Sequence, residues 1–144
     1  MATRGRDPEA LVDTSVAVAL VTADHEHHEA TLTAIGGRRL GLAGHAVFET
    51  FSVLTRLPSA ARRPPEVVAG LMAENFPDSR FLSADGAAAL VPRLTSARIA
   101  GGSVYDALVG AAAREHGIVL VTRDRRALAT YRVLDVEVEV LPDG

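Results

Sequence analysis

The chain has 144 residues, of which 48% are hydrophobic and 23% charged, which suits one domain with a real core and leaves no room for two comfortable ones. It contains no cysteine and no lysine, and this excludes disulfides, thiolate zinc sites, a cysteine nucleophile, the P-loop lysine and Schiff-base chemistry. The net charge of −3 is not that of a typical nucleic-acid-binding protein.

Residues 1–10 form a polar segment with Pro8, which we predict to be a flexible lead-in to a single domain at residues 11–144. Asp13 interrupts the apolar run that follows, and a charge inside that run is unfavourable for a signal peptide. No run approaches the roughly 20 apolar residues that a membrane span needs. We therefore expect a soluble, cytoplasmic protein without membrane association.

The first predicted elements are a buried strand at Leu11–Asp13 and a helix at Thr14–Thr22. Asp, Thr and Ser are favoured at a helix N-terminus because their side-chain oxygens accept hydrogen bonds from its free N–H groups. In an open α/β sheet, ligands bind where a strand passes into a helix. The junction at Asp13 is therefore the first candidate for a functional site.

Further along the chain, apolar runs, glycines and prolines predict alternating helices and strands. The first half continues with a helix at Glu26–Ile35, a strand at Leu40–Ala43, and helices at His45–Leu57 and Pro65–Asn75. The second half has strands at Phe81–Ser83, Ile118–Thr122 and Val136–Leu141, and helices at Ala87–Ser96, Ser103–His116 and Arg125–Tyr131. This alternation predicts the α/β class, with a mostly parallel central sheet in a three-layer α/β/α arrangement.

Four carboxylates stand out, and each has a purely structural alternative. Asp13 and Asp124 can each cap the helix that follows, and Ser103 with Asp106 has the spacing of a capping box. Glu49 lies in a mostly apolar helix, where it faces either the core or, on an amphipathic helix, the solvent.

Taken together, the acids point to a metal site. Asp13 and Asp124 follow buried parallel strands and so lie at the same edge of the sheet, and Asp106 lies in the first turn of the helix before the second of these strands. Converging carboxylates repel one another unless a cation is shared, and oxygen ligands without thiolates favour Mg²⁺ or Mn²⁺ over zinc. The hydroxyls expected to support the carboxylates or metal-bound waters are those of Thr14, Ser15 and Thr122.

The order of these motifs resembles a known family. The chain reads Val12-Asp13-Thr14-Ser15-Val16, then Glu49, then Tyr105-Asp106-Ala107-Leu108, then Leu120-Val121-Thr122-Arg123-Asp124-Arg125-Arg126. This pattern is similar to that of PIN-domain ribonucleases, above all the VapC-type toxins of bacterial toxin–antitoxin pairs. The family usually has a glycine-containing turn before its last strand, where this chain has Val133-Leu134-Asp135-Val136.

The resemblance implies that Asp13, Glu49, Asp106 and Asp124 form the catalytic and metal-binding site of an endoribonuclease. One or two Mg²⁺ ions, or Mn²⁺ in their place, would activate water for in-line attack on RNA. It further implies a homodimer and a cognate VapB-like antitoxin that inserts a basic side chain into the acidic site. Two alternatives stay open: a housekeeping nuclease with the same site, and a degenerate PIN module that only binds.

Arginines near this edge of the sheet, or on a connection that reaches it, are candidates for RNA contact as a group, although each alone is typical of a solvated surface charge. They are Arg62, Arg63, Arg123, Arg125 and Arg126. The motif His25-Glu26-His27-His28 looks like a metal cluster, but it lacks the spacing of a zinc-binding helix and we do not expect zinc there.

Overall fold

The computed structural model describes residues 7–142, so residues 1–6 of the predicted lead-in lie outside the described part of the chain. The strands are β1 (Ala10–Val12), β2 (Leu40–Leu42), β3 (Leu120–Thr122) and β4 (Val138–Val140). The helices are α1 (Thr14–Val21), α2 (His28–Ile35), α3 (Ala46–Thr55), α4 (Pro65–Asn75), α5 (Ala84–Ala97), α6 (Ser103–His116) and α7 (Leu128–Val133), with a 3₁₀ turn η1 (Arg125–Ala127) before α7.

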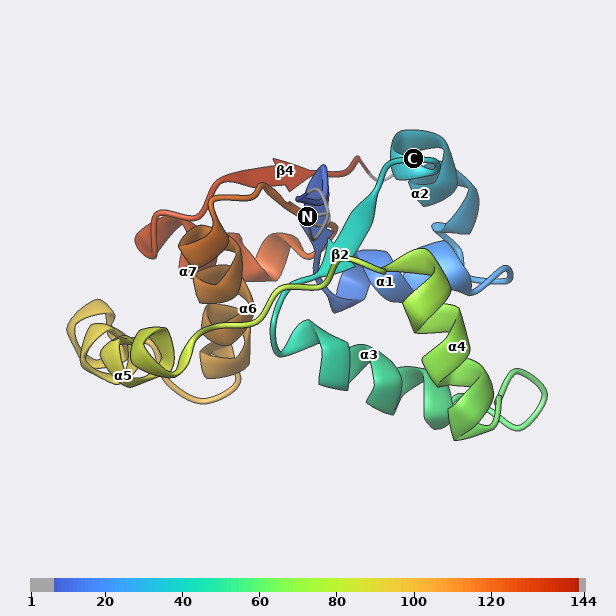
Figure 1. The fold of residues 1–144 in the computed structure, drawn as a ribbon, viewed down its shortest axis with the longest axis horizontal. Coiled ribbons are helices and arrows are strands. Elements are labelled where there is room, and N and C mark those ends of the chain that lie inside the picture. Colours follow the sequence, from blue (N-terminus) through green and yellow to red (C-terminus); the bar gives the residue numbers. More distant parts are fainter. Residues whose placement is uncertain (1–6, 143–144) are drawn as a thin grey trace, which may run out of the picture.

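The four strands form one parallel sheet in the order β2-β1-β3-β4. Helices α1 to α4 gather on one side of this sheet and α5 to α7 on the other, which gives the predicted three layers (Figure 1). The two inner strands are fully buried, whereas β4 is half-buried at the edge, as its alternating sequence predicts. The α/β class is confirmed, and the described sheet is parallel throughout. None of the helices within residues 7–142 has both the length and the apolar character needed to cross a bilayer.

The pairing of β1 with β3 determines where the functional groups lie. Val12 is in register with Val121, and the Asp13 N–H donates to the Val121 carbonyl at 3.3 Å. Because the strands are parallel and adjacent, the residues that follow them emerge at the same edge of the sheet. Ala10, which we had assigned to the lead-in, is the first residue of β1 and is completely buried.

The predicted strand at Phe81–Ser83 is wrong. Next to β2 there is an isolated bridge between Ala43 and Arg80, and Ser83 instead caps α5, with its hydroxyl accepting from the Gly86 N–H at 2.9 Å. Helix α5 therefore begins three residues earlier than predicted. A run of three residues carries too little periodicity to separate a strand from a helix cap.

Helix α6 has the predicted bounds, and Gly117 ends it in the left-handed conformation at φ 66°. Within α6, Gly110 allows a close approach of α7 and of the turn that follows it. A Cβ at this position would lie 3.0 Å from both Tyr131 Cδ1 and Val136 Cγ2. The absence of a side chain at Gly110 therefore lets the Tyr131 ring pack against α6, and this positions its hydroxyl for the site.

The turn before β4 lacks the glycine that the family usually has there, and Asp135 adopts the left-handed conformation at φ 58°. Aspartate tolerates this region better than most residues, because its short polar side chain bonds locally. Its carboxylate is also approached by two arginines, Arg93 at 3.9 Å and Arg114 at 3.7 Å. Asp135 thus keeps the turn geometry without a glycine.

We expect Asp135→Val to lower the free energy of unfolding by about 1–2 kcal/mol, because a β-branched residue is strained at positive φ. Asp135→Gly should stay within about 1 kcal/mol of the wild type, since glycine relieves the strain but adds freedom to the unfolded chain. Urea unfolding measures both. A valine variant as stable as the wild type would contradict the assigned backbone conformation.

Candidate active site

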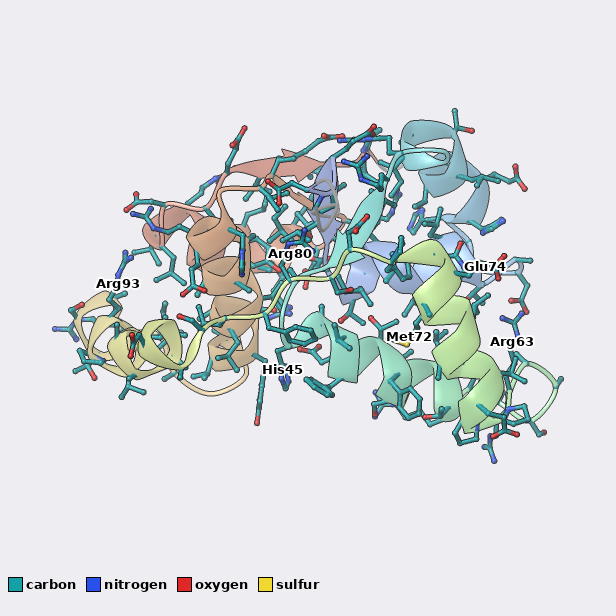
Figure 2. The ribbon with its side chains drawn as sticks, viewed as in Figure 1. His45, Arg63, Met72, Glu74, Arg80 and Arg93 are labelled. Atoms are coloured by element: carbon teal, nitrogen blue, oxygen red, sulfur yellow. The ribbon has the colours of Figure 1, made fainter. Side chains whose placement is uncertain are left out.

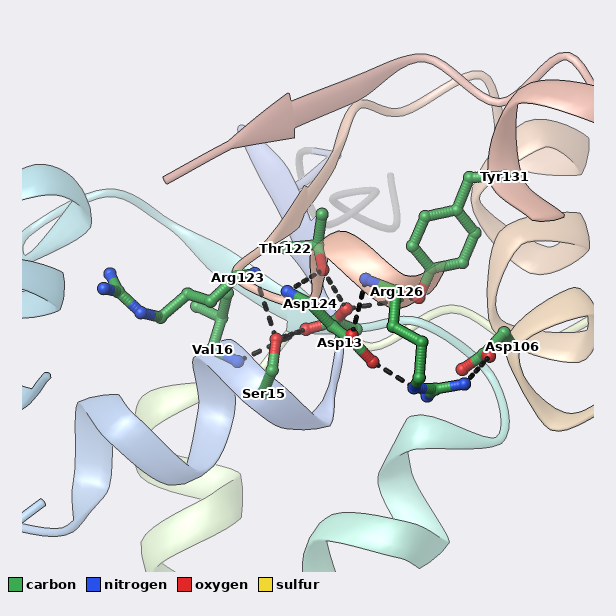
Figure 3. A network of polar contacts seen from close by, with 9 residues as sticks. All are labelled: Asp13, Ser15, Val16, Asp106, Thr122, Arg123, Asp124, Arg126 and Tyr131. Carbon is green, nitrogen blue, oxygen red and sulfur yellow. Dashed lines mark hydrogen bonds and ion pairs between the residues drawn. The ribbon is translucent and has the colours of Figure 1, made fainter. Parts of the chain in front are cut away.

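Asp13 lies at the junction of β1 and α1, where it caps the helix. Its Oδ1 accepts from the Ser15 hydroxyl at 2.5 Å and from the Val16 N–H at 3.2 Å. Its Oδ2 accepts from the Thr122 hydroxyl and from the Tyr131 hydroxyl at 3.1 Å (Figure 3). Four donors from three separate segments therefore fix the orientation of this carboxylate.

The Asp13 residue is only 5% exposed. Burial raises the pKa of this carboxyl, and the four hydrogen bonds act in the opposite direction. The N-terminus of α1 adds a favourable partial positive charge. Burial and the nearby Asp13 raise the pKa of Tyr131 well above its ordinary value, so its phenol stays protonated and donates.

Two hydroxyls connect Asp13 to the end of β3. The Thr122 hydroxyl donates to Asp13 and accepts from the Asp124 N–H at 2.9 Å, while the Ser15 hydroxyl donates to Asp13 and accepts from the Arg123 N–H at 3.0 Å. Asp124 caps the 3₁₀ turn, with its Oδ1 accepting from the Arg126 N–H at 3.0 Å. Both predicted caps, at Asp13 and Asp124, are therefore real, and they are part of the same network.

The predicted capping box of Ser103 and Asp106 is wrong. Helix α6 begins at Ser103 itself, so Gly102 is the cap residue and no side chain caps the helix. The Asp106 carboxylate instead pairs with the Arg126 guanidinium at 3.4 Å, and the same guanidinium lies 2.9 Å from Asp124 Oδ2. Figure 3 shows Arg126 reaching between the two carboxylates. Their charges raise the pKa of Arg126.

Glu49 points neither into the core nor simply into solvent. It is 39% exposed and lines a cleft of about 640 Å³ that Asp106 and Arg126 also line. Burial raises the pKa of Glu49, and the negative charges of Asp106 and Asp13 raise it further, whereas His45 at 3.6 Å opposes the shift. The pKa of Asp106 is raised in the same way, first by burial and then by Asp124, against the effect of Arg126. Charge interactions therefore connect Glu49 with Asp13 and Asp106, and Asp106 with Asp124, at one edge of the sheet.

Of the three hydroxyls expected to support the carboxylates, Ser15 and Thr122 bond Asp13. Thr14 does not: its hydroxyl is buried without a hydrogen-bond partner, and the residue lines a separate pocket of about 400 Å³ together with His25 and Arg123. Tyr131, which sequence reasoning missed, supplies the remaining side-chain donor. Its signal was weak, because a tyrosine on a short apolar helix is typical of core packing.

The predicted arginines are distributed differently from our expectation. Arg126 lines the cleft, and Arg125 lies beside Asp124 at the start of the 3₁₀ turn. The Arg123 guanidinium turns away from the carboxylates and donates to the Thr31 hydroxyl at 3.3 Å and the Pro142 carbonyl at 2.9 Å (Figure 3).

The two arginines predicted to reach the site from the connection after α3 do not reach it. Arg62 and Arg63 line a different pocket, and Figure 2 shows Arg63 near the right edge of the molecule, well apart from His45, which lines the cleft near the centre of the view. The cleft does contain Arg56, an arginine that sequence reasoning did not select. Arg56 is the cap residue at the C-terminal end of α3, and the sequence around it did not indicate which way its side chain points.

Within residues 7–142, no three His, Asp or Glu side chains stand close enough together to hold a metal ion in the arrangement that the structure has. The donor set nevertheless fits a divalent cation. Its ligands are all oxygen, two of the acids have raised pKa values in part from mutual repulsion, and a cationic side chain already bridges Asp106 and Asp124. Arg126 therefore provides positive charge between Asp106 and Asp124, where a metal cation would also be favourable.

The fold and the site together define an α/β/α protein with an acidic, oxygen-only site at the carboxyl edge of a parallel sheet. Residues 10–133 match the family model of the PIN domain, and the chain belongs to the PIN-domain family. PIN-domain ribonucleases are generally dependent on divalent metal ions.

The chain is similar to two ribonucleases of Mycobacterium tuberculosis. It is 44% identical to Ribonuclease VapC27 of strain H37Rv, over 92% of this chain and 97% of that protein. It is also 44% identical to Ribonuclease VapC40 of strain CDC 1551, over 90% of this chain and 96% of that protein. Among solved structures, FitAcB from Neisseria gonorrhoeae has the same fold, with a TM-score of 0.62 at 17% identity over 90% of this chain and 95% of that one.

We expect Arg126→Gln to enlarge the rise in melting temperature that Mn²⁺ produces. The variant leaves Asp106 and Asp124 without their shared cation, so the metal-free protein loses stability and the ion no longer competes with a guanidinium. A thermal shift titration with Mn²⁺ measures the effect. Arg132→Gln removes an exposed charge from α7 and is the control; equal shifts in both variants would contradict the role of Arg126.

We also expect Glu49→Gln to stabilise the metal-free protein increasingly as the pH rises. Because the folded-state pKa of Glu49 is raised, its contribution to stability is fully present below the unfolded-state pKa and is lost as the pH rises through the folded value. Urea midpoints in chelator should therefore coincide at about pH 4 and favour the variant at about pH 7.5. Added Mn²⁺ should reverse the order. A variant that is less stable at the higher pH without metal would refute the electrostatic account.

Proposed function

We propose that the chain is a divalent-metal-dependent endoribonuclease toxin of the VapC kind, which hydrolyses phosphodiester bonds in RNA. One observation carries the proposal: carboxylates from four separated segments interact electrostatically at one edge of the sheet. Glu49 and Asp106 line the same cleft, Arg126 pairs with both Asp106 and Asp124, and the charge of Asp13 acts on Glu49. The similarity to two VapC ribonucleases over nearly the whole chain supports the same function.

The four acids are the residues that would hold the metal. Bound there, Mg²⁺, or Mn²⁺ in its place, supplies a water activated for attack and neutralises charge on the departing oxygen. Asp13 is the rigid member of the set, because its four hydrogen bonds leave its carboxylate one orientation. Asp106, Asp124 and Glu49 are only partly buried, and their side chains can adjust around an ion.

Arg126 and Arg56 provide positive charge on the walls of the cleft. Arg126 pairs with Asp106 and Asp124 in this structure; with a cation held by those carboxylates, its guanidinium would be available to the phosphates of the substrate. Such contacts hold the RNA backbone without reading its sequence. Hydrolysis by a metal-activated water would require no nucleophile from the protein, in keeping with a chain that has neither lysine nor cysteine.

The proposed partner is a VapB-like antitoxin that places a basic side chain among the acids. Arg126 already does this within the chain, which shows that a guanidinium fits between Asp106 and Asp124. A homodimer, which rests on the family resemblance, and a cytoplasmic location belong to the same proposal. A degenerate module that only binds is disfavoured, because such a module has no need to keep four repelling carboxylates together.

We expect Asp13→Asn, Asp106→Asn and Asp124→Asn each to lower the rate of RNA cleavage by at least about 100-fold, because each removes part of the metal's binding site. Induced in a bacterial host, each variant should also lose the growth inhibition of the wild type. Glu74→Gln, an exposed acid on α4, is the matched control and should act like the wild type. Circular dichroism checks the fold. Undiminished cleavage by the Asp13 variant would overturn the assignment.

A further inference from the structure

Four aromatic rings follow one another, and we call them the aromatic row: three line the acidic cleft, and the fourth, Phe81, lines the apolar pocket beside it. Tyr105 stacks on His45 with ring centroids 5.1 Å apart and planes at 22°. His45 lies 6.4 Å from Phe48, and Phe48 lies 6.2 Å from Phe81, both in tilted arrangements. The row therefore connects α6, the start of α3 and the segment before α5.

The exposure of these rings is unusual for this chain. Phe48 is 62% exposed, Tyr105 53% and Phe81 49%. The sequence holds only four phenylalanines, two tyrosines and no tryptophan, so half of its phenylalanine and tyrosine rings lie in this one row. Burying an aromatic ring contributes strongly to the stability of a core. Three rings exposed together on the surface of a small protein therefore indicate a binding site.

Three rings of the aromatic row line the same cleft as two of the acids. His45, Phe48 and Tyr105 line the cleft of about 640 Å³ that also holds Glu49 and Asp106. Each acid is adjacent in sequence to a ring, and the His45 Nε2 atom lies 3.6 Å from Glu49 Oε1. The cleft has the size of sites that hold a small ligand such as a nucleotide.

We propose that the aromatic row is a base-stacking platform for single-stranded RNA, which holds nucleotides beside the phosphate that is cut. This inference rests on the proposed function. Every nucleobase has a flat π-face, so a row of exposed rings binds unpaired bases of any sequence, while duplex bases are already stacked and not available. Arg56 and Arg126 in the same cleft meet the phosphates that such bases carry.

The arrangement favours RNA over an apolar protein segment as the occupant. The end of the row formed by Tyr105 and His45 combines nearly parallel rings with polar atoms and borders two carboxylates and two arginines. An apolar segment would leave these charges buried without partners, whereas a nucleotide bound with a metal ion provides a base for the rings and a phosphate for the arginines.

The test distinguishes stacking on an aromatic ring from a general hydrophobic contribution to RNA binding. Phe48→Leu and Tyr105→Leu keep an apolar side chain but remove the π-face, and Phe48→Trp enlarges it. Placed in the Glu49→Gln background with Mg²⁺, each leucine variant should bind a fluorescein-labelled single-stranded RNA about five- to a hundred-fold more weakly. Phe48→Trp should bind at least as tightly as the parent, and its tryptophan, the only one in the chain, should be quenched by RNA. Val91→Ala, an equally exposed apolar position on α5, is the control.

Cleavage assays with otherwise wild-type chains distinguish the possible failures. We expect the leucine variants to raise KM more than they lower kcat. For an RNA with an abasic position next to the cut, we expect the leucine variants and the wild type to have similar KM values, because no base is there to stack. Leucine variants that bind and cut RNA like the wild type would overturn the platform while the proposed function stands. If they instead alter only self-association, measured by gel filtration, the row is a protein interface and the platform is wrong. A wild-type chain that cuts no RNA with Mg²⁺ or Mn²⁺ would remove the proposed function itself.

Discussion

The buried carboxylate of Asp13 is the contact on which the rest of the site depends. It is a buried carboxylate in a small protein, and it is tolerable there only because donors from α1, β3 and α7 surround it. The same donors bring Asp124 and the 3₁₀ turn into position through the Thr122 hydroxyl. Satisfying one carboxylate therefore assembles one side of the cleft, and the small Gly110 on α6 makes room for the tyrosine that completes it.

Electrostatic repulsion governs the opposite side of the cleft. Glu49 and Asp106 are partly buried close to other acids, so their ionised forms are disfavoured and their pKa values rise. Arg126 relieves part of this repulsion by pairing with Asp106 and Asp124. A divalent ion would relieve this repulsion more strongly than Arg126 does. Metal affinity and the pH dependence of stability therefore both reflect the excess negative charge of the site.

Helices α3 and α6 each carry an acid and a ring side by side. Glu49 follows Phe48 on α3, and Asp106 follows Tyr105 on α6, with His45 contacting both a ring and a carboxylate. Such a layout places groups for metal, phosphate and base around one cleft. The exposed rings and the repelling acids are both unfavourable in the free protein. A bound RNA strand would cover the rings, and its metal ion would neutralise the acids.

The sequence by itself determined the class of fold and the full bounds of α4 and α6, because buried strands, helix caps and prolines are local signals. It also singled out the four acids that we propose as the site. Its errors lay where local signals are ambiguous, at the supposed strand before α5 and the supposed capping box at Ser103. Only the tertiary structure decided that Tyr131 bonds Asp13, that Arg123 turns away and that Arg126 bridges two acids. Side-chain direction and contacts between distant segments depend on how the layers pack, and no run of neighbouring residues encodes them.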